Sequence, residues 1–158
     1  MSTATEMKHR QAMVNGCNWA IAHRSEIHYA EIRPMPIHTS INHGFTTDCS
    51  GFVTLMAKWG GCSDPNGLNF DGQGYTGTML EHLPHIPFKQ TLRGDLLVIG
   101  AYPGIHVVAL LADGQLTNTP QVASLGGPGD PRSFLLSEEI GFFGSDVEVT
   151  YLRLQVPS

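Results

Sequence analysis

The stretch Thr47-Asp48-Cys49-Ser50-Gly51-Phe52-Val53 places a cysteine directly before an apolar helical pattern. The next apolar residues recur at helical spacing and predict one buried helix face, made of Phe52, Leu55, Met56 and Trp59. Cys49 joins that face at the first turn. There, unpaired N–H groups and the helix dipole favour the thiolate, which is the nucleophilic form of cysteine. The stretch predicts either a reactive cysteine or a small buried core residue.

The composition predicts a single globular domain over residues 1–158, long enough to bury a sizeable core. The net charge of -5 argues against nonspecific nucleic-acid binding, which needs a basic face. No apolar run approaches a membrane span, and the polar start Met1–Arg10 lacks the apolar core of a signal peptide. We therefore expect synthesis in the cytoplasm, without a signal peptide or a membrane span.

The three cysteines are an odd number at wide spacings, which is neither a disulfide framework nor a zinc signature. Cys17 lies on the apolar stripe of a helix predicted from Met7 to about Ile27, so we expect it in the core. Cys62 lies in a turn-rich loop and is expected to be a bystander. We expect no metal and no other cofactor.

Predicted helices precede predicted strands. The helix that starts at Cys49 should end at Gly60-Gly61, and a short helix is expected over Thr76–Leu83. Beyond Arg93 the pattern changes to short strands, over Leu96–Ile99, Ile105–Leu111, Gln115–Thr119 and Val147–Leu154. This order predicts an α+β fold, with N-terminal helices packed on a small antiparallel β-sheet.

His106 lies inside the apolar strand Ile105–Leu111. Burying an imidazole there is costly without hydrogen-bond partners. It is therefore either a structural histidine with its bonds satisfied, or the partner of a helix-start thiolate that later protonates a leaving amine. In the second case a third polar group should fix the orientation of the ring.

Three motifs in this order resemble those of the NlpC/P60 cysteine peptidases: Asp48-Cys49-Ser50-Gly51-Phe52-Val53, Gly94-Asp95-Leu96, and His106-Val107 in a strand. The runs Asp64–Gly67 and Gly72–Thr78 are similar to members encoded by bacteriophages of actinobacteria. The resemblance covers about Thr46 to Thr119. It implies a papain-like fold and a cysteine endopeptidase that cleaves stem peptides of bacterial peptidoglycan. A phage lysin, released at lysis or carried by the virion, is the expected setting.

The resemblance also implies site residues. Cys49 and His106 would be catalytic, and Asp48 and Ser50 would help to bind the amino end of the substrate. The Tyr-x-Trp-Gly-Gly run that usually precedes Asp-Cys is missing. Tyr29, twenty residues before Cys49, is expected to substitute for it.

The family's third residue lies on the strand after the histidine strand, which here falls on Asn118. Its amide oxygen can accept from an imidazole N–H. A two-residue turn at Asp113-Gly114 would pair Asn118 with Ala109 and turn it away from His106. A bulged three-residue loop would place Asn118 opposite Val108, diagonal to His106. We predict a Cys49–His106–Asn118 set with the bulged loop.

With the tight turn, Thr119 or Gln121 would take the third role in place of Asn118.

Two other functions fit the same sequence. Related folds cleave the N-acetylmuramoyl-L-alanine bond, so an amidase is a second candidate function. A non-catalytic phage wall-binding or structural module is a third, although a Cys, a His and an Asn at the family's positions argue against it.

Overall fold

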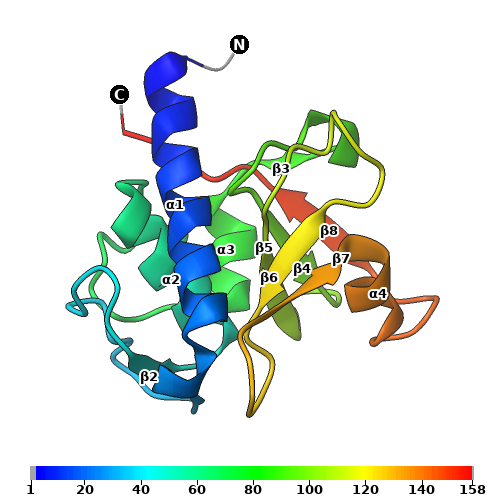
Figure 1. Ribbon diagram of the computed structural model, residues 1–158. Coiled ribbons are helices and arrows are strands. Elements are labelled where there is room, and N and C mark those ends of the chain that lie inside the picture. The colour runs from blue at the N-terminus through cyan, green and yellow to red at the C-terminus, as the bar shows by residue number, and fades with distance from the viewer. Residues whose placement is uncertain (1–2, 158) are drawn as a thin grey trace.

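The computed structural model describes residues 3–157, in which four α-helices and eight β-strands are present (Figure 1). The helices are α1 (Ala4–Ala22), α2 (Cys49–Gly60), α3 (Thr76–His82) and α4 (Leu136–Gly141). The strands are β1 (Ile27–Tyr29), β2 (Phe45–Thr47), β3 (His85–Ile86), β4 (Leu96–Ile99), β5 (His106–Leu110), β6 (Gln121–Ser124), β7 (Arg132–Leu135) and β8 (Val149–Leu152). None of the helices within the described residues is long and apolar enough to cross a membrane.

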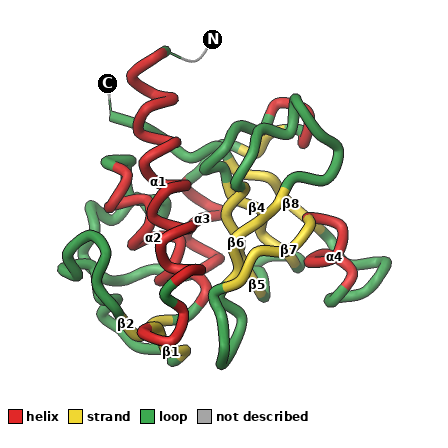
Figure 2. The backbone as a smooth tube through the Cα atoms, viewed as in Figure 1, coloured by secondary structure: helices red, strands yellow, loops and turns green. Residues whose placement is uncertain are grey.

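Six of the strands form one antiparallel sheet in the order β3-β8-β4-β5-β6-β7. Helices α1, α2 and α3 lie on one side of this sheet, and α4 lies on the other side, next to β7 (Figure 2). Helices α1, α2 and α3 precede the six strands of the antiparallel sheet, which confirms the predicted α+β class.

The sheet buries apolar side chains on both faces because its central strands alternate between two cores. One core joins α1 and α2 to the residues Leu96, Val98, Val107, Ala109, Ala123, Leu125 and Leu152. The other core gathers Leu97, Ile99, Val108, Leu110 and Val122 with Leu136 of α4. The nearly continuous apolar run of β5 is thus explained by burial on both sides. Cys17 is fully buried in the first core, as predicted.

Helix α2 has the predicted bounds, and local chemistry sets both ends. The Asp48 carboxylate accepts a hydrogen bond from the Gly51 N–H (2.8 Å) and caps the start. Gly61 has φ +77° and ends the helix in the left-handed conformation that glycine favours. A Cβ added at Gly51 would lie 1.8 Å from the Thr47 Oγ1, so the chain approaches the helix start too closely for a side chain.

Helix α1 differs from the prediction, because it ends at Ala22 and not at Ile27. After one 3₁₀ turn (Arg24–Glu26), Ile27 begins β1, which pairs in parallel with β2. This register places Tyr29 beside Thr47, two residues before Cys49. A partner strand that lies far along the chain thus overrides the apolar periodicity of the helix.

The predicted strand over Gln115–Thr119 is wrong, and so are both hairpin turns considered for Asp113-Gly114. Residues 111–120 form a loop, and the returning strand β6 begins at Gln121. The Asp113 carboxylate accepts from the Arg93 N–H (2.8 Å) and the Gly114 N–H donates to the Thr91 oxygen (3.0 Å). Asp113-Gly114 therefore docks this loop on the segment before β4 and makes no hairpin.

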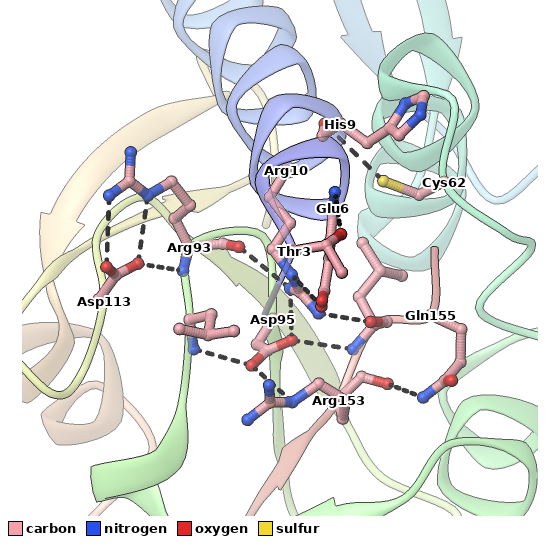
Figure 3. A network of polar contacts seen from close by, with 12 residues as sticks. Thr3, Glu6, His9, Arg10, Cys62, Arg93, Asp95, Asp113, Arg153 and Gln155 are labelled. Atoms are coloured by element: carbon pink, nitrogen blue, oxygen red, sulfur yellow. Dashed lines mark hydrogen bonds and ion pairs between the residues drawn. The ribbon is translucent and has the colours of Figure 1, made fainter. Parts of the chain in front are cut away.

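Asp95 of the Gly94-Asp95 motif joins distant parts of the chain (Figure 3). Its fully buried carboxylate accepts from Arg10 Nη1 of α1 (2.7 Å), the Leu92 N–H (2.9 Å) and the Leu154 N–H (2.9 Å). Arg153 Nε lies 3.3 Å from Asp95 Oδ2, the oxygen that accepts from the Leu92 N–H. The motif has a structural role, since it fastens α1 and the segment after β8 to the start of β4.

Candidate functional site

Cys49 is the first residue of α2, and its side chain is half-buried. The twelve-residue helix begins with N–H groups that have no intrahelical partner, so its positive end faces the thiol. Cys49 lines two cavities, while the other two cysteines are buried in the core. Its position fits a nucleophile better than a packing residue.

His106 is the first residue of β5 and is 5% exposed. Burial lowers the pKa of its imidazole, but hydrogen bonds to Cys49 and Glu139 and the negative charges of both outweigh burial and raise the pKa to about 9. The ring is therefore an imidazolium at neutral pH. Cys49 lines the same cavity as this ring.

Two polar side chains hold the far nitrogen of the His106 ring. Nε2 lies 2.8 Å from the Ser124 hydroxyl and 2.9 Å from Glu139 Oε1, and the Ser124 hydroxyl donates to the same Oε1 (2.8 Å). Because Nε2 faces this pair, Nδ1 is the nitrogen that remains for Cys49. Ser124 and Glu139 are buried, so the three groups form a desolvated chain of hydrogen bonds.

The structure does not place Asn118 at His106. Asn118 lies in the loop after β5, where its amide oxygen accepts from Lys89 Nζ. The register pairs Ala109 with Ala123, so continuing it by one residue puts Ser124 opposite Val108, diagonal to His106. Ser124 therefore occupies the position predicted for Asn118, because the loop is longer than either turn considered.

The two fallback residues do not reach His106 either. Thr119 lies in the same loop and its hydroxyl pairs with Ser137 (3.2 Å), while Gln121 is exposed at the start of β6 and pairs with Leu135.

Glu139 was not predicted as a site residue. The sequence held one indication of it: Glu139 lies three residues after Leu136 and one before Ile140, which is the spacing of an apolar helix face.

Phe143, which follows α4, covers the imidazole. Its ring stacks on His106 with centroids 5.4 Å apart and planes inclined by 21°. Phe142 is 67% exposed and packs edge-on against Phe134 at 5.4 Å. Helix α4 and the residues after it thus supply both the carboxylate that bonds His106 Nε2 and the aromatic ring that stacks on the imidazole.

Asp48 and Ser50, the residues predicted to bind the amino end of a substrate, contact each other and Arg33. The Ser50 hydroxyl donates to Asp48 Oδ1 (3.1 Å). Arg33 Nη1 lies 3.0 Å from Asp48 Oδ2, and Arg33 Nη2 donates to the Ser50 oxygen (2.9 Å). The carboxylate next to the nucleophile is therefore already neutralised by a cation of the same chain.

Tyr29 lines the same cavity as Cys49 and His106. Burial raises the pKa of its phenol, and the charges of Cys49, Glu31 and Asp48 raise it further. The phenol therefore keeps its proton at neutral pH and can donate a hydrogen bond. The parallel pairing of β1 with β2 is what brings it to the site.

Two cavities meet at Cys49 and Ile105. One, of about 480 Å³, is polar and is lined by Glu31, Arg33, Asp48, Ser50, Tyr75 and Thr76. The other, of about 350 Å³, is largely aromatic and is lined by Tyr29, His106, Glu139, Phe134, Phe142 and Phe143. An extended ligand bound in both cavities would therefore pass the Cys49 thiol where it crosses from one cavity to the other.

The loop between α2 and α3 ends at Tyr75, which lines the polar cavity. Asn66 Nδ2 donates to the Thr54 oxygen of α2 (3.1 Å), and the Thr78 hydroxyl of α3 donates to Asn66 Oδ1 (2.7 Å). The Gly74 carbonyl of this loop accepts from Arg33 Nε (2.9 Å). The turn-rich runs on either side of Phe70 therefore position the residues that enclose Asp48.

No protein-family model matches the sequence, and no curated protein matches it. The function is therefore inferred from the site and its motifs. A half-buried thiol at a helix start, a buried imidazolium and an orienting carboxylate are the parts that nucleophilic catalysis by cysteine requires.

Proposed function

We propose that the protein is a cysteine endopeptidase of the papain-like NlpC/P60 type that cleaves stem peptides of bacterial peptidoglycan. The observation that carries the proposal is that Cys49, at a helix start, and His106, held by Ser124 and Glu139, line one cavity that meets a second cavity at Cys49. The peptidoglycan substrate and the phage-lysin setting rest on the sequence motifs.

The catalytic cycle follows from the roles of these groups. The Cys49 thiolate attacks the carbonyl carbon of the scissile amide, and the oxyanion accepts hydrogen bonds from the Cys49 N–H and, in our assignment, the Tyr29 hydroxyl. The C–N bond then breaks as the His106 imidazolium gives its proton to the leaving amine. Water, deprotonated by neutral His106, hydrolyses the thioester, releasing a carboxylic acid and the free enzyme. Glu139 and Ser124 keep the ring oriented throughout.

Purified protein incubated with actinobacterial cell walls tests the proposal. We expect new amino ends, and product masses in which part of each stem peptide stays attached to the sugar, whereas an amidase would release whole stem peptides. Cys49→Ala should abolish the release, and His106→Ala should cost nearly as much because the two groups act as a unit. The absence of release by the wild type, or equal release by Cys49→Ala, would contradict the proposal.

A further inference from the structure

Arg33 occupies the anionic end of the polar cavity. Its guanidinium bridges Asp48 Oδ2 (3.0 Å) and the Ser50 hydroxyl (2.9 Å), both within two residues of the nucleophile. Without Arg33, a carboxylate and a hydroxyl beside the thiol would form a site for a substrate ammonium group. With Arg33 in place, that site already contains a cation.

Asp48 has little capacity left for a ligand. Its Oδ1 accepts from the Gly51 N–H (2.8 Å) and the Ser50 hydroxyl (3.1 Å), and its Oδ2 faces Arg33. The residue is 7% exposed. An incoming ammonium group would have to displace the guanidinium or lie beside it, where two like charges repel each other.

Arg33 is also fastened from behind. Its Nε donates to the Gly74 carbonyl (2.9 Å), and its Nη1 donates to the Ile32 carbonyl (2.8 Å). Swinging the guanidinium away from Asp48 would break these two bonds as well. Glu31 also lines the cavity, but it is exposed, so solvent screens its charge and it does not reverse the effect of Arg33.

We infer that Arg33 is a specificity-determining residue that makes the polar cavity select peptides whose amino end is acylated over peptides that end in a free ammonium group. The inference rests on the proposed function and deepens it. A stem peptide joined to its sugar has an acylated first residue, whereas a stem peptide released from the sugar has a free amino group. The protein would therefore act on the intact wall and not on released fragments.

The test measures binding separately from catalysis. Two stem peptides that differ only in an N-acetyl or a free amino end are titrated into the Cys49→Ala protein by calorimetry. We expect the acetylated peptide to bind at least about 10-fold more tightly. Arg33→Met on the same background should shift the ratio of the two dissociation constants by roughly 10- to 100-fold toward the free amine, the range of a charge-assisted hydrogen bond.

Three further variants make the result specific. Arg33→Lys keeps the charge and should keep the preference. Asp48→Asn added to Arg33→Met should remove the gain, because asparagine still caps the helix but lacks the negative charge. Arg24→Met removes an exposed arginine that does not line the cavity, and it should leave the ratio unchanged.

The outcomes separate the two proposals. An unchanged ratio in Arg33→Met, with circular dichroism showing the wild-type fold, overturns the role of Arg33 and leaves the proposed function standing. Tighter binding of the free amine than of the acetylated peptide by the Cys49→Ala protein also overturns it. Failure of both peptides to bind, together with intact cell walls after incubation with the wild type, contradicts the proposed function itself.

Discussion

The three cysteines differ in reactivity because their surroundings differ. Burial raises the pKa of Cys17 to about 12 and that of Cys62 to about 11, so both remain thiols at neutral pH. Cys49 is half-buried at a helix start and lines the same cavity as His106. One cysteine of the three is thus suited to react.

We expect iodoacetamide to label Cys49 before Cys17 and Cys62, and to abolish wall cleavage at the same rate as it labels. Peptide mass mapping over time measures this order, and Cys49→Ala is the control that should label slowly. Faster labelling of Cys17 or Cys62, with activity retained, would show that the nucleophile is wrongly assigned.

The charge on His106 sets the alkaline side of the expected pH profile. Its pKa is raised to about 9, so the imidazolium is present below that pH and is lost as pH rises through it. We expect the initial rate of wall cleavage to fall with an apparent pKa of about 9. Glu139→Gln removes a charge that raises this pKa, so the alkaline limb should move to lower pH, with a rate loss on the order of 10 to 100-fold from poorer orientation.

Asn118→Ala is the matched control for this measurement. Asn118 contacts Lys89 in a loop and does not contact His106, so its variant should keep the wild-type rate and profile. An unshifted alkaline limb in Glu139→Gln, or a large loss in Asn118→Ala, would return the third role to the residue predicted from the sequence.

At the scale of one element, α2 requires glycine at residue 51, although glycine has a low helix propensity. An alanine Cβ at residue 51 would lie 1.8 Å from Thr47 Oγ1. We expect Gly51→Ala to lower the free energy of unfolding by about 1–3 kcal/mol, the usual cost of overpacking. Urea unfolding measures the loss, and adding Thr47→Ala should restore part of it.

Gly127→Ala serves as the control for that prediction, since no heavy atom lies within 4 Å of a Cβ added there. It should change stability by less than about 0.5 kcal/mol, as for other surface substitutions. Equal stability of the Gly51→Ala and Gly127→Ala proteins would mean that the contact with Thr47 is relieved at no cost.

At the scale of the whole molecule, one buried ion pair connects the helical part to the sheet. Asp95→Ala would remove the fully buried carboxylate that Arg10 Nη1 contacts and leave this buried guanidinium with the part-buried Glu6 as its remaining carboxylate partner. We expect a loss of about 3–5 kcal/mol in urea unfolding. Asp113→Ala breaks a partly exposed pair with Arg93 and should cost roughly 1 kcal/mol. A similar loss in both variants would contradict the role given to Asp95.

The sequence alone determined the parts of this protein that depend on neighbouring residues. Apolar periodicity, the Asp48 cap and the Gly60-Gly61 stop predicted α2 and placed Cys49 at its first turn. The apolar run around His106 predicted a strand buried on both faces. These features are local, since a few residues and the helix or strand repeat fix them.

The tertiary structure decided which distant residues meet at Cys49. Glu139 lies 33 residues after His106, on a helix that was not predicted, and Arg33 lies 17 residues before Ser50 in a loop. The connection between β5 and β6 could not be predicted, because Asp113-Gly114 is equally suited to a turn and to docking on Arg93 and Thr91. The length of this connection sets the strand register, and a slip in register changes which residue lies diagonal to His106. Such pairings depend on long-range packing, about which local patterns carry no information.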